Sequence, residues 1–235
     1  MVLGAAFSVG LGLYFLRDVL SQSPVSRDLP KIGSYSAYTL LAFLFLTLLY
    51  NLDVLLVKCF FTDLEAGYYM AAATIARMVF FGSTAIAGAM FPKVAAWNEA
   101  GNGDTARELL RDALLYTGVL AGLGAFFLNT FPRFAVSLLF GGAYIESAHL
   151  VGPLSIAMLF LSLSYVLSLY ELALGARKFL YALMVGCLIQ STGIVIFHGR
   201  LGQVALVMIV AMASVFGLMV LLKVRCQREN TLCKL

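Results

Sequence analysis

Charged residues are scarce in this chain of 235 residues. They make up 12% of the sequence, whereas soluble globular proteins carry about 25%. Hydrophobic residues account for 62%, and so few charges cannot cover the surface of a soluble protein of this length. Lipid must therefore solvate most of the side chains, which excludes a soluble domain and predicts an integral membrane protein.

The chain also lacks the alternating pattern of a membrane barrel. Barrel strands are segments of about ten residues in which apolar and polar side chains alternate, but the apolar runs here are long and unbroken. Helices and closed barrels are the two structures that satisfy every backbone polar group in hydrocarbon. We therefore predict an all-α protein.

Several kinds of functional site are missing as well. The 4 cysteines show no C-x-x-C spacing, and the 2 histidines form no H-E-x-x-H pair. There is no G-x-S-x-G elbow and no glycine-rich phosphate loop with lysine. The net charge of +4 is too small to indicate nucleic-acid binding. We expect no enzymatic activity, no metal, no disulfide, no cofactor and no nucleic-acid partner.

Apolar runs near the length that spans a bilayer, about 20 residues, predict about seven transmembrane helices. They cover roughly residues 1–16, 35–57, 67–91, 112–131, 148–171, 179–197 and 201–222.

Proline and charge are expected to end these helices. Segment 17–33 contains Pro24 and Pro30 among charged residues and is predicted to be a loop in water. Pro92 is predicted to close the third helix, and segment 132–147 is read either as a short amphipathic helix along the membrane surface or as a loop packed on the helix ends.

The basic residues predict the orientation of the chain. Twelve of the 16 Lys and Arg residues fall in segments 17–33, 92–111 and 172–178 and in the tail from residue 223, all on one side of the predicted membrane. The opposite side has three. Because basic residues are enriched in cytoplasmic loops, we predict an N-terminus outside and a cytoplasmic C-terminus.

Two charged residues fall inside predicted helices, Asp53 and Arg77. A charge within the bilayer costs at least about 2.5–3.5 kcal/mol on insertion scales, so it usually faces a partner or a cavity. Arg77 lies ten residues after Gly67, which is about 15 Å along a helix. Two alternatives stay open: an ion pair with Asp53, or a wet cavity in which the guanidinium binds an anion such as phosphate.

Other polar residues recur at helical spacing and are candidates for lining such a cavity. Near the pair these are Asn51, Lys58 and Thr74, and the secondary candidates farther along the chain are Ser164, Ser168, Glu171 and Gln190. The alternative for each is that small polar side chains join helices to one another.

Motifs along the chain resemble those of a known family. The sequence resembles the second half of the polysaccharide flippases of the multidrug/oligosaccharidyl-lipid/polysaccharide exporter superfamily, over roughly residues 34–222. The resemblance rests on Asp53-Val-Leu-Leu-Val-Lys58, Ala66-Gly67-Tyr68-Tyr69, Ala76-Arg77, Met90-Phe91-Pro92, Leu138-Leu139-Phe140-Gly141 and Ala173-Leu174-Gly175-Ala176-Arg177-Lys178.

The resemblance implies a domain organisation. Such transporters have two lobes of six helices, so residues 1–16 are expected to be the last helix of the first lobe and 17–33 a cytoplasmic link. Residues 34–222 are expected to form a MATE-like second lobe and 223–235 a cytoplasmic tail. About five helices of the family pattern are missing before Met1, which leaves open a truncated record, a split gene or a functional half that pairs with a partner lobe or a second copy.

The resemblance also implies a function. The chain is expected to flip lipid-diphosphate-linked oligosaccharides across the plasma membrane for surface polysaccharide export, by alternating access. Arg77 would hold the diphosphate and Asp53 would orient it, with Lys58 a weaker candidate. Transport would draw on a Na⁺ or H⁺ gradient or on the membrane potential. The alternatives are a cation-coupled multidrug antiporter of the same superfamily and a non-transporting membrane subunit that docks on a partner.

Overall fold

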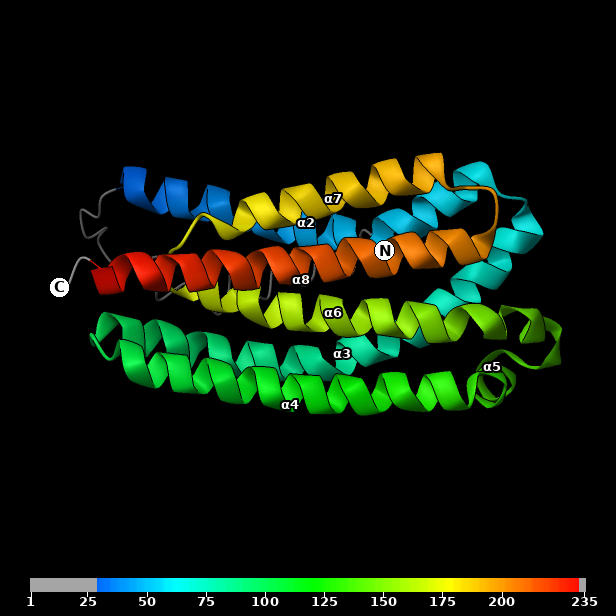
Figure 1. Cartoon of the computed structure of the whole chain (residues 1–235), viewed down its shortest axis with the longest axis horizontal. Coiled ribbons are helices and arrows are strands. Elements are labelled where there is room, and N and C mark those ends of the chain that lie inside the picture. The colour runs from blue at the N-terminus through cyan, green and yellow to red at the C-terminus, as the bar shows by residue number, and fades with distance from the viewer. Residues whose placement is uncertain (1–28, 233–235) are drawn as a thin grey trace, which may run out of the picture. The chain divides into compact units, whose positions relative to one another are not determined.

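A computed structural model describes the backbone of residues 29–232 and the side chains of residues 36–225. Over these residues the chain is helical and contains no strand (Figure 1). The helices are α2 (Leu29–Phe60), α3 (Asp63–Glu99), α4 (Gly103–Thr130), α5 (Pro132–Phe140), the 3₁₀ helix η1 (Gly142–Ser147), α6 (Ala148–Ala173), α7 (Phe179–Ile196) and α8 (Leu201–Leu232).

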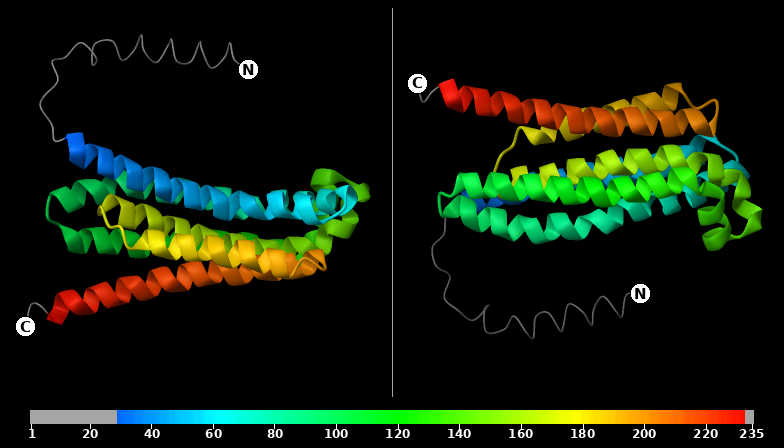
Figure 2. Two further views of the ribbon diagram at one scale, coloured as in Figure 1. Left: turned by 90° about the horizontal axis from the view of Figure 1, so that it is seen from above. Right: turned by 60° about the horizontal axis from the view of Figure 1, so that its bottom comes forward.

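The chain divides into two units, residues 1–37 and residues 38–235. Within the second unit α6 is the central helix, because it packs against α3, α4 and α8, while α7 packs on α8 (Figure 2). Most of the apolar stretch of the span that ends with α6 is buried inside the protein, at 67%, against 28% for α4. Helix α6 therefore forms the core of the unit, and α4 presents most of its surface outward.

Six stretches of the described chain are long and apolar enough to cross a membrane. They are 36–60, 63–99, 103–130, 142–173, 179–196 and 201–225. Large apolar side chains such as Phe126 and Leu138 stand on the exposed surface, where lipid is their natural solvent. The prediction of an all-α polytopic membrane protein is confirmed, and the span expected at 1–16 lies outside the described residues.

The expected end of the third helix is wrong. Helix α3 passes through Pro92 and continues to Glu99. A proline removes one backbone hydrogen bond, and membrane helices tolerate it where neighbouring groups or water satisfy the freed carbonyl. The predicted loop 92–111 shrinks to Ala100–Asn102, where Gly101 adopts φ +76°, a conformation that favours glycine.

Two other boundaries differ from the sequence prediction. Helix α2 begins at Leu29, so the last residues of the expected loop 17–33 are helical. Pro30 falls in the first turn of that helix, where its missing N–H leaves no intrahelical bond unmade. Helix α8 extends beyond residue 222 to Leu232.

Segment 132–147 is helical, as the first of its two interpretations requires. Helix α5 starts with Pro132 at its first turn, buries Ala135 and Val136, and ends at Gly141 with φ +79°. Phe134 remains on the exposed side. This amphipathic pattern is typical of a helix at a membrane surface, and its position relative to the bilayer stays a prediction.

Helices α7 and α8 pack closely at Gly186. A Cβ atom at this position would lie 2.0 Å from Val215 Cγ2, whereas a Cβ at Gly217 of α8 would meet nothing within 4 Å. We expect Gly186→Ala to destabilise the protein by about 1–3 kcal/mol through overpacking. The control Gly217→Ala should be neutral or mildly stabilising, because alanine favours helix. Thermal unfolding in detergent measures both, and equal stability of the two variants would contradict this packing.

Candidate functional site

A tight turn between α2 and α3 places Asp53 and Arg77, the two charges within the predicted spans, opposite each other. Thr62 caps α3, since its hydroxyl accepts a hydrogen bond from Glu65 N (3.4 Å) while Thr62 N donates to the Glu65 carboxylate (3.1 Å). Only Phe61 and Thr62 separate the helices. The helices are therefore antiparallel neighbours. Asp53 of α2 lies opposite the part of α3 that carries Tyr69 and Arg77.

Both carboxylate oxygens of Asp53 have partners on α3. The Tyr69 hydroxyl donates to Oδ2 (3.0 Å), and Arg77 Nη2 donates to Oδ1 (3.1 Å). Tyr69 and Arg77 are eight residues apart and so share one face of the helix. Asp53 has an exposed fraction of 0%. The predicted ion pair between Asp53 and Arg77 is confirmed.

Arg77 is held on one side and retains donors on the other. Its Nη2 also donates to the carbonyl of Tyr50 (2.8 Å), and its guanidinium carbon lies 4.4 Å from the centre of the Tyr50 ring, a cation–π distance. Neither Nε nor Nη1 makes a hydrogen bond to any described residue, and 14% of the side chain is exposed. Nε is itself buried, so the two N–H donors of Nη1 are those that can still bind an acceptor oxygen such as that of a phosphate.

Aromatic side chains support the pair from the side. The Tyr50 ring contacts Phe80 and Phe81 at 5.5 and 5.8 Å between centroids, and Phe80 contacts Tyr165 of α6 at 5.4 Å. These distances are typical of favourable aromatic pairs. The ion pair is thus connected to the central helix by packed rings that limit its movement.

The other predicted residues near the pair have different partners. Lys58 is exposed and forms an ion pair with Asp63 at the start of α3. Asn51 and Thr74 each donate to the carbonyl four residues earlier in their own helix (3.1 and 2.8 Å). The structure therefore brings together Asp53 and Arg77, and a role of the other three in substrate binding stays a prediction.

The secondary candidates lie on two helices, with Ser164, Ser168 and Glu171 on α6 and Gln190 on α7, and none reaches Arg77 with a described hydrogen bond. Ser164 and Ser168 donate to carbonyls of their own helix (2.8 and 2.7 Å). Gln190 is buried and donates from Nε2 to Leu49 O of α2 (3.3 Å). Glu171 lies 3.6 Å from Lys223 Nζ. These bonds hold helices together or satisfy hydroxyls locally.

Sequence reasoning missed Tyr69 as a member of this site. Its hydroxyl is the second donor to Asp53, and its side chain is fully buried. A usable signal was present: the hydroxyl-bearing Tyr69 precedes Arg77 by two helical turns, on the face that must contact Asp53.

We expect the loss of the buried Asp53–Arg77 pair to lower the free energy of unfolding far more than the loss of the exposed Lys58–Asp63 pair. Asp53→Asn leaves a buried guanidinium without its counter-charge, and we expect a loss of about 3–5 kcal/mol. The control Lys58→Gln removes an exposed ion pair and should change stability little. The double variant Asp53→Leu/Arg77→Met should recover much of the loss, because it removes both charges. Unfolding in detergent measures the series, and an unchanged Asp53→Asn protein would contradict the site.

Comparison with known proteins identifies the family. No curated protein and no solved structure matches the chain. The model of the family described as "Polysaccharide biosynthesis protein" matches residues 2–149, which is more than half of the chain and includes Asp53, Tyr69 and Arg77. The resemblance found in the motifs is thereby confirmed, and this polytopic membrane chain belongs to the polysaccharide biosynthesis protein family.

Proposed function

We propose that the chain is a transporter lobe that flips lipid-diphosphate-linked oligosaccharides across the plasma membrane for surface polysaccharide export. The family match and six helices able to span a membrane support a transport role in polysaccharide biosynthesis. The observation that carries the substrate class is Arg77, a guanidinium within a predicted span whose Nη1 makes no hydrogen bond to a described residue. An arginine fork suits phosphate oxygens.

Each neighbour of Arg77 has a role in this proposal. Asp53 fixes Nη2 and thereby orients the fork, while the Tyr50 ring supports one face of the guanidinium. A diphosphate would accept hydrogen bonds from the remaining donors and partly replace the Asp53 contact. When the substrate leaves, the carboxylate restores the pair, so the empty site is not left with an uncompensated charge.

Alternating access requires two halves that move about a central site. A partner lobe or a second copy of the chain would supply the other half, and the membrane potential or an ion gradient would supply the driving force. No enzymatic step is involved in this scheme, since the substrate moves without bond cleavage.

A second candidate, a cation-coupled drug antiporter, draws support from Asp53. A fully buried carboxylate between two helices is a place where Na⁺ or H⁺ could compete with Arg77. Efflux of a cationic dye from vesicles under an imposed Na⁺ or H⁺ gradient tests it. Gradient-driven efflux without any effect on lipid-linked oligosaccharide would favour this candidate over the first.

Replacing Arg77 should abolish export. With each variant substituted for the native gene copy, we expect Arg77→Gln to lower surface polysaccharide roughly 10- to 100-fold, since a charged hydrogen bond contributes about 1.5–3 kcal/mol. Arg77→Lys keeps the charge but loses the forked donors of arginine, so its surface polysaccharide should lie between that of the wild type and that of Arg77→Gln. Arg133→Gln, an exposed arginine of α5, is the control. Normal export by a stably folded Arg77→Gln protein would remove Arg77 from the mechanism.

The proposed orientation can be tested through Cys59. This cysteine is free and exposed, and it follows Lys58 near the end of α2. The charge distribution predicts that this end of α2 lies outside the cell. A membrane-impermeant maleimide should label it in intact cells, and Cys59→Ser should abolish that labelling. Ala176→Cys, in the α6–α7 turn, should react only after the cells are opened. The reverse pattern would invert the predicted topology.

A further inference from the structure

Helices α4, α6 and α8 line an open groove that shares no residue with the Asp53–Arg77 site. The groove, here called the α4–α8 groove, has a volume of about 530 Å³. It is lined by Arg107, Leu110, Arg111, Leu114, Leu115 and Gly118 of α4, by Leu163 and Leu167 of α6, and by Phe216, Val220, Lys223 and Val224 of α8.

One end of this groove is positively charged. Arg107 and Arg111 are exposed on α4, and Arg111 forms no ion pair with any residue that the structure describes. Arg107 pairs with Asp104 at 3.1 Å, but that carboxylate is 99% exposed, and such surface pairs are weak. The donors of both arginines therefore remain available to an anion.

Lys223 of α8 adds a third, buried positive charge to the lining of the groove. Its buried Nζ lies 3.7 Å from the ring centre of Tyr170 and 3.6 Å from Glu171. A neighbouring cavity of about 320 Å³ shares Arg107 and Lys223 with the groove and is also lined by Arg177 and Lys178. The charged residues that line the two cavities are therefore mainly cationic, with Glu171 as their acidic member, whereas Asp104, Glu108 and Asp112 of α4 lie outside both linings.

The rest of the groove is apolar. Gly118 follows Arg111 by seven residues and Phe216 precedes Lys223 by seven, so the apolar floor extends about 10 Å from the charges along both helices. Leu115 is 56% exposed, which shows that the groove is open along its side. A Cβ at Gly118 would meet Leu163 at 3.9 Å, an ordinary contact, so a side chain larger than alanine is needed to obstruct the groove there.

We propose that the α4–α8 groove binds an anionic glycerophospholipid of the surrounding membrane. The phosphate contacts Arg107 and Arg111 in the field of Lys223, and one acyl chain lies along the apolar floor. Basic pockets between membrane helices recognise anionic headgroups in this way. Two features commit the site to a lipid: exposed apolar side chains such as Leu115 border the groove, and the charges of its lining lie only at one end.

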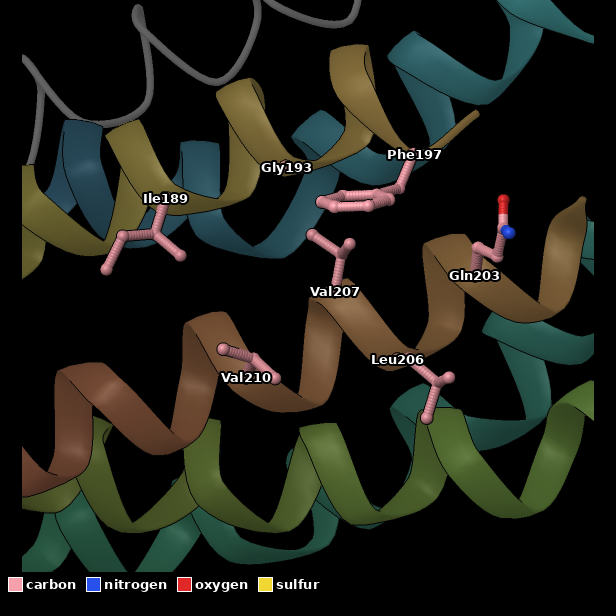
Figure 3. Close-up of a pocket in the computed structure, with 7 residues that line it drawn as sticks. All are labelled: Ile189, Gly193, Phe197, Gln203, Leu206, Val207 and Val210. Atoms are coloured by element: carbon pink, nitrogen blue, oxygen red, sulfur yellow. The ribbon is translucent and has the colours of Figure 1, made fainter. Parts of the chain in front are cut away.

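A second groove in the protein shows what is specific to this one. Helices α7 and α8 line a cavity of about 340 Å³ whose residues include Ile189, Phe197 and Val207 and no charged side chain (Figure 3). Acyl chains of any lipid suit that surface. Selection of an anionic headgroup requires the cations that α4 and α8 provide in the α4–α8 groove.

The proposal does not depend on the transported substrate, and lipid retention tests it directly. The purified full chain is equilibrated with phosphatidylglycerol or phosphatidylcholine, and bound lipid is counted by native mass spectrometry. We expect the wild type to retain phosphatidylglycerol roughly tenfold better, equivalent to about 1.4 kcal/mol. Arg107→Gln/Arg111→Gln should abolish this preference, whereas the control Arg133→Gln/Arg200→Gln should preserve it.

Filling the groove separates a lipid site from a simple anion site. Gly118→Leu keeps every cation and obstructs the apolar floor, so it should also abolish phosphatidylglycerol retention, and Val220→Trp serves if Gly118→Leu fails to fold. Equal retention of the two lipids by the wild type would overturn the proposal, as would full retention by the double arginine variant. Competition by inorganic phosphate at equal concentration, or preferential retention of a polyprenyl phosphate, would also overturn it.

Discussion

Hydrocarbon offers no hydrogen-bond partner to a peptide group, and this constraint shapes every described element. An unsatisfied backbone group in the bilayer costs several kcal/mol, so each span must be a helix that closes its own hydrogen bonds. The hydroxyls of Ser164 and Ser168 return to carbonyls of α6 for the same reason.

The same low dielectric makes the Asp53–Arg77 pair obligatory once either residue is present. A lone carboxylate in this position would be neutralised or expelled, and Asp53 instead uses both oxygens, one for Arg77 and one for Tyr69. Arg77 differs because its own bonds use Nη2 alone among the described contacts. The pair is therefore asymmetric: a saturated anion holds a cation that can still bind, which is the arrangement an anion-transporting site needs.

Hydropathy predicted the six described spans because a run of about 20 apolar residues has few alternatives to a membrane helix. It placed their ends poorly, since a helix end depends on caps and on tolerated prolines such as Pro92 and Pro30. Asp53 and Arg77 stood out because charges are rare in such runs. Spacing could not distinguish Thr74, which bonds its own helix, from Tyr69, which bonds Asp53, because that difference depends on how α2 and α3 are rotated against each other.

The charge distribution connects the proposed lipid groove to the proposed topology. Arg107, Arg111 and Lys223 lie on segments that the positive-inside rule places on the cytoplasmic side, where the leaflet's anionic lipids attract basic residues. A lipid in the α4–α8 groove would join two helices that both pack on α6. Arg77, in contrast, lies on the α2–α3 side of that helix. Helix α3 also packs on α6 and α4, so the Asp53–Arg77 pair and the groove belong to one packed unit, and a lobe that rocks as a rigid body would carry both together.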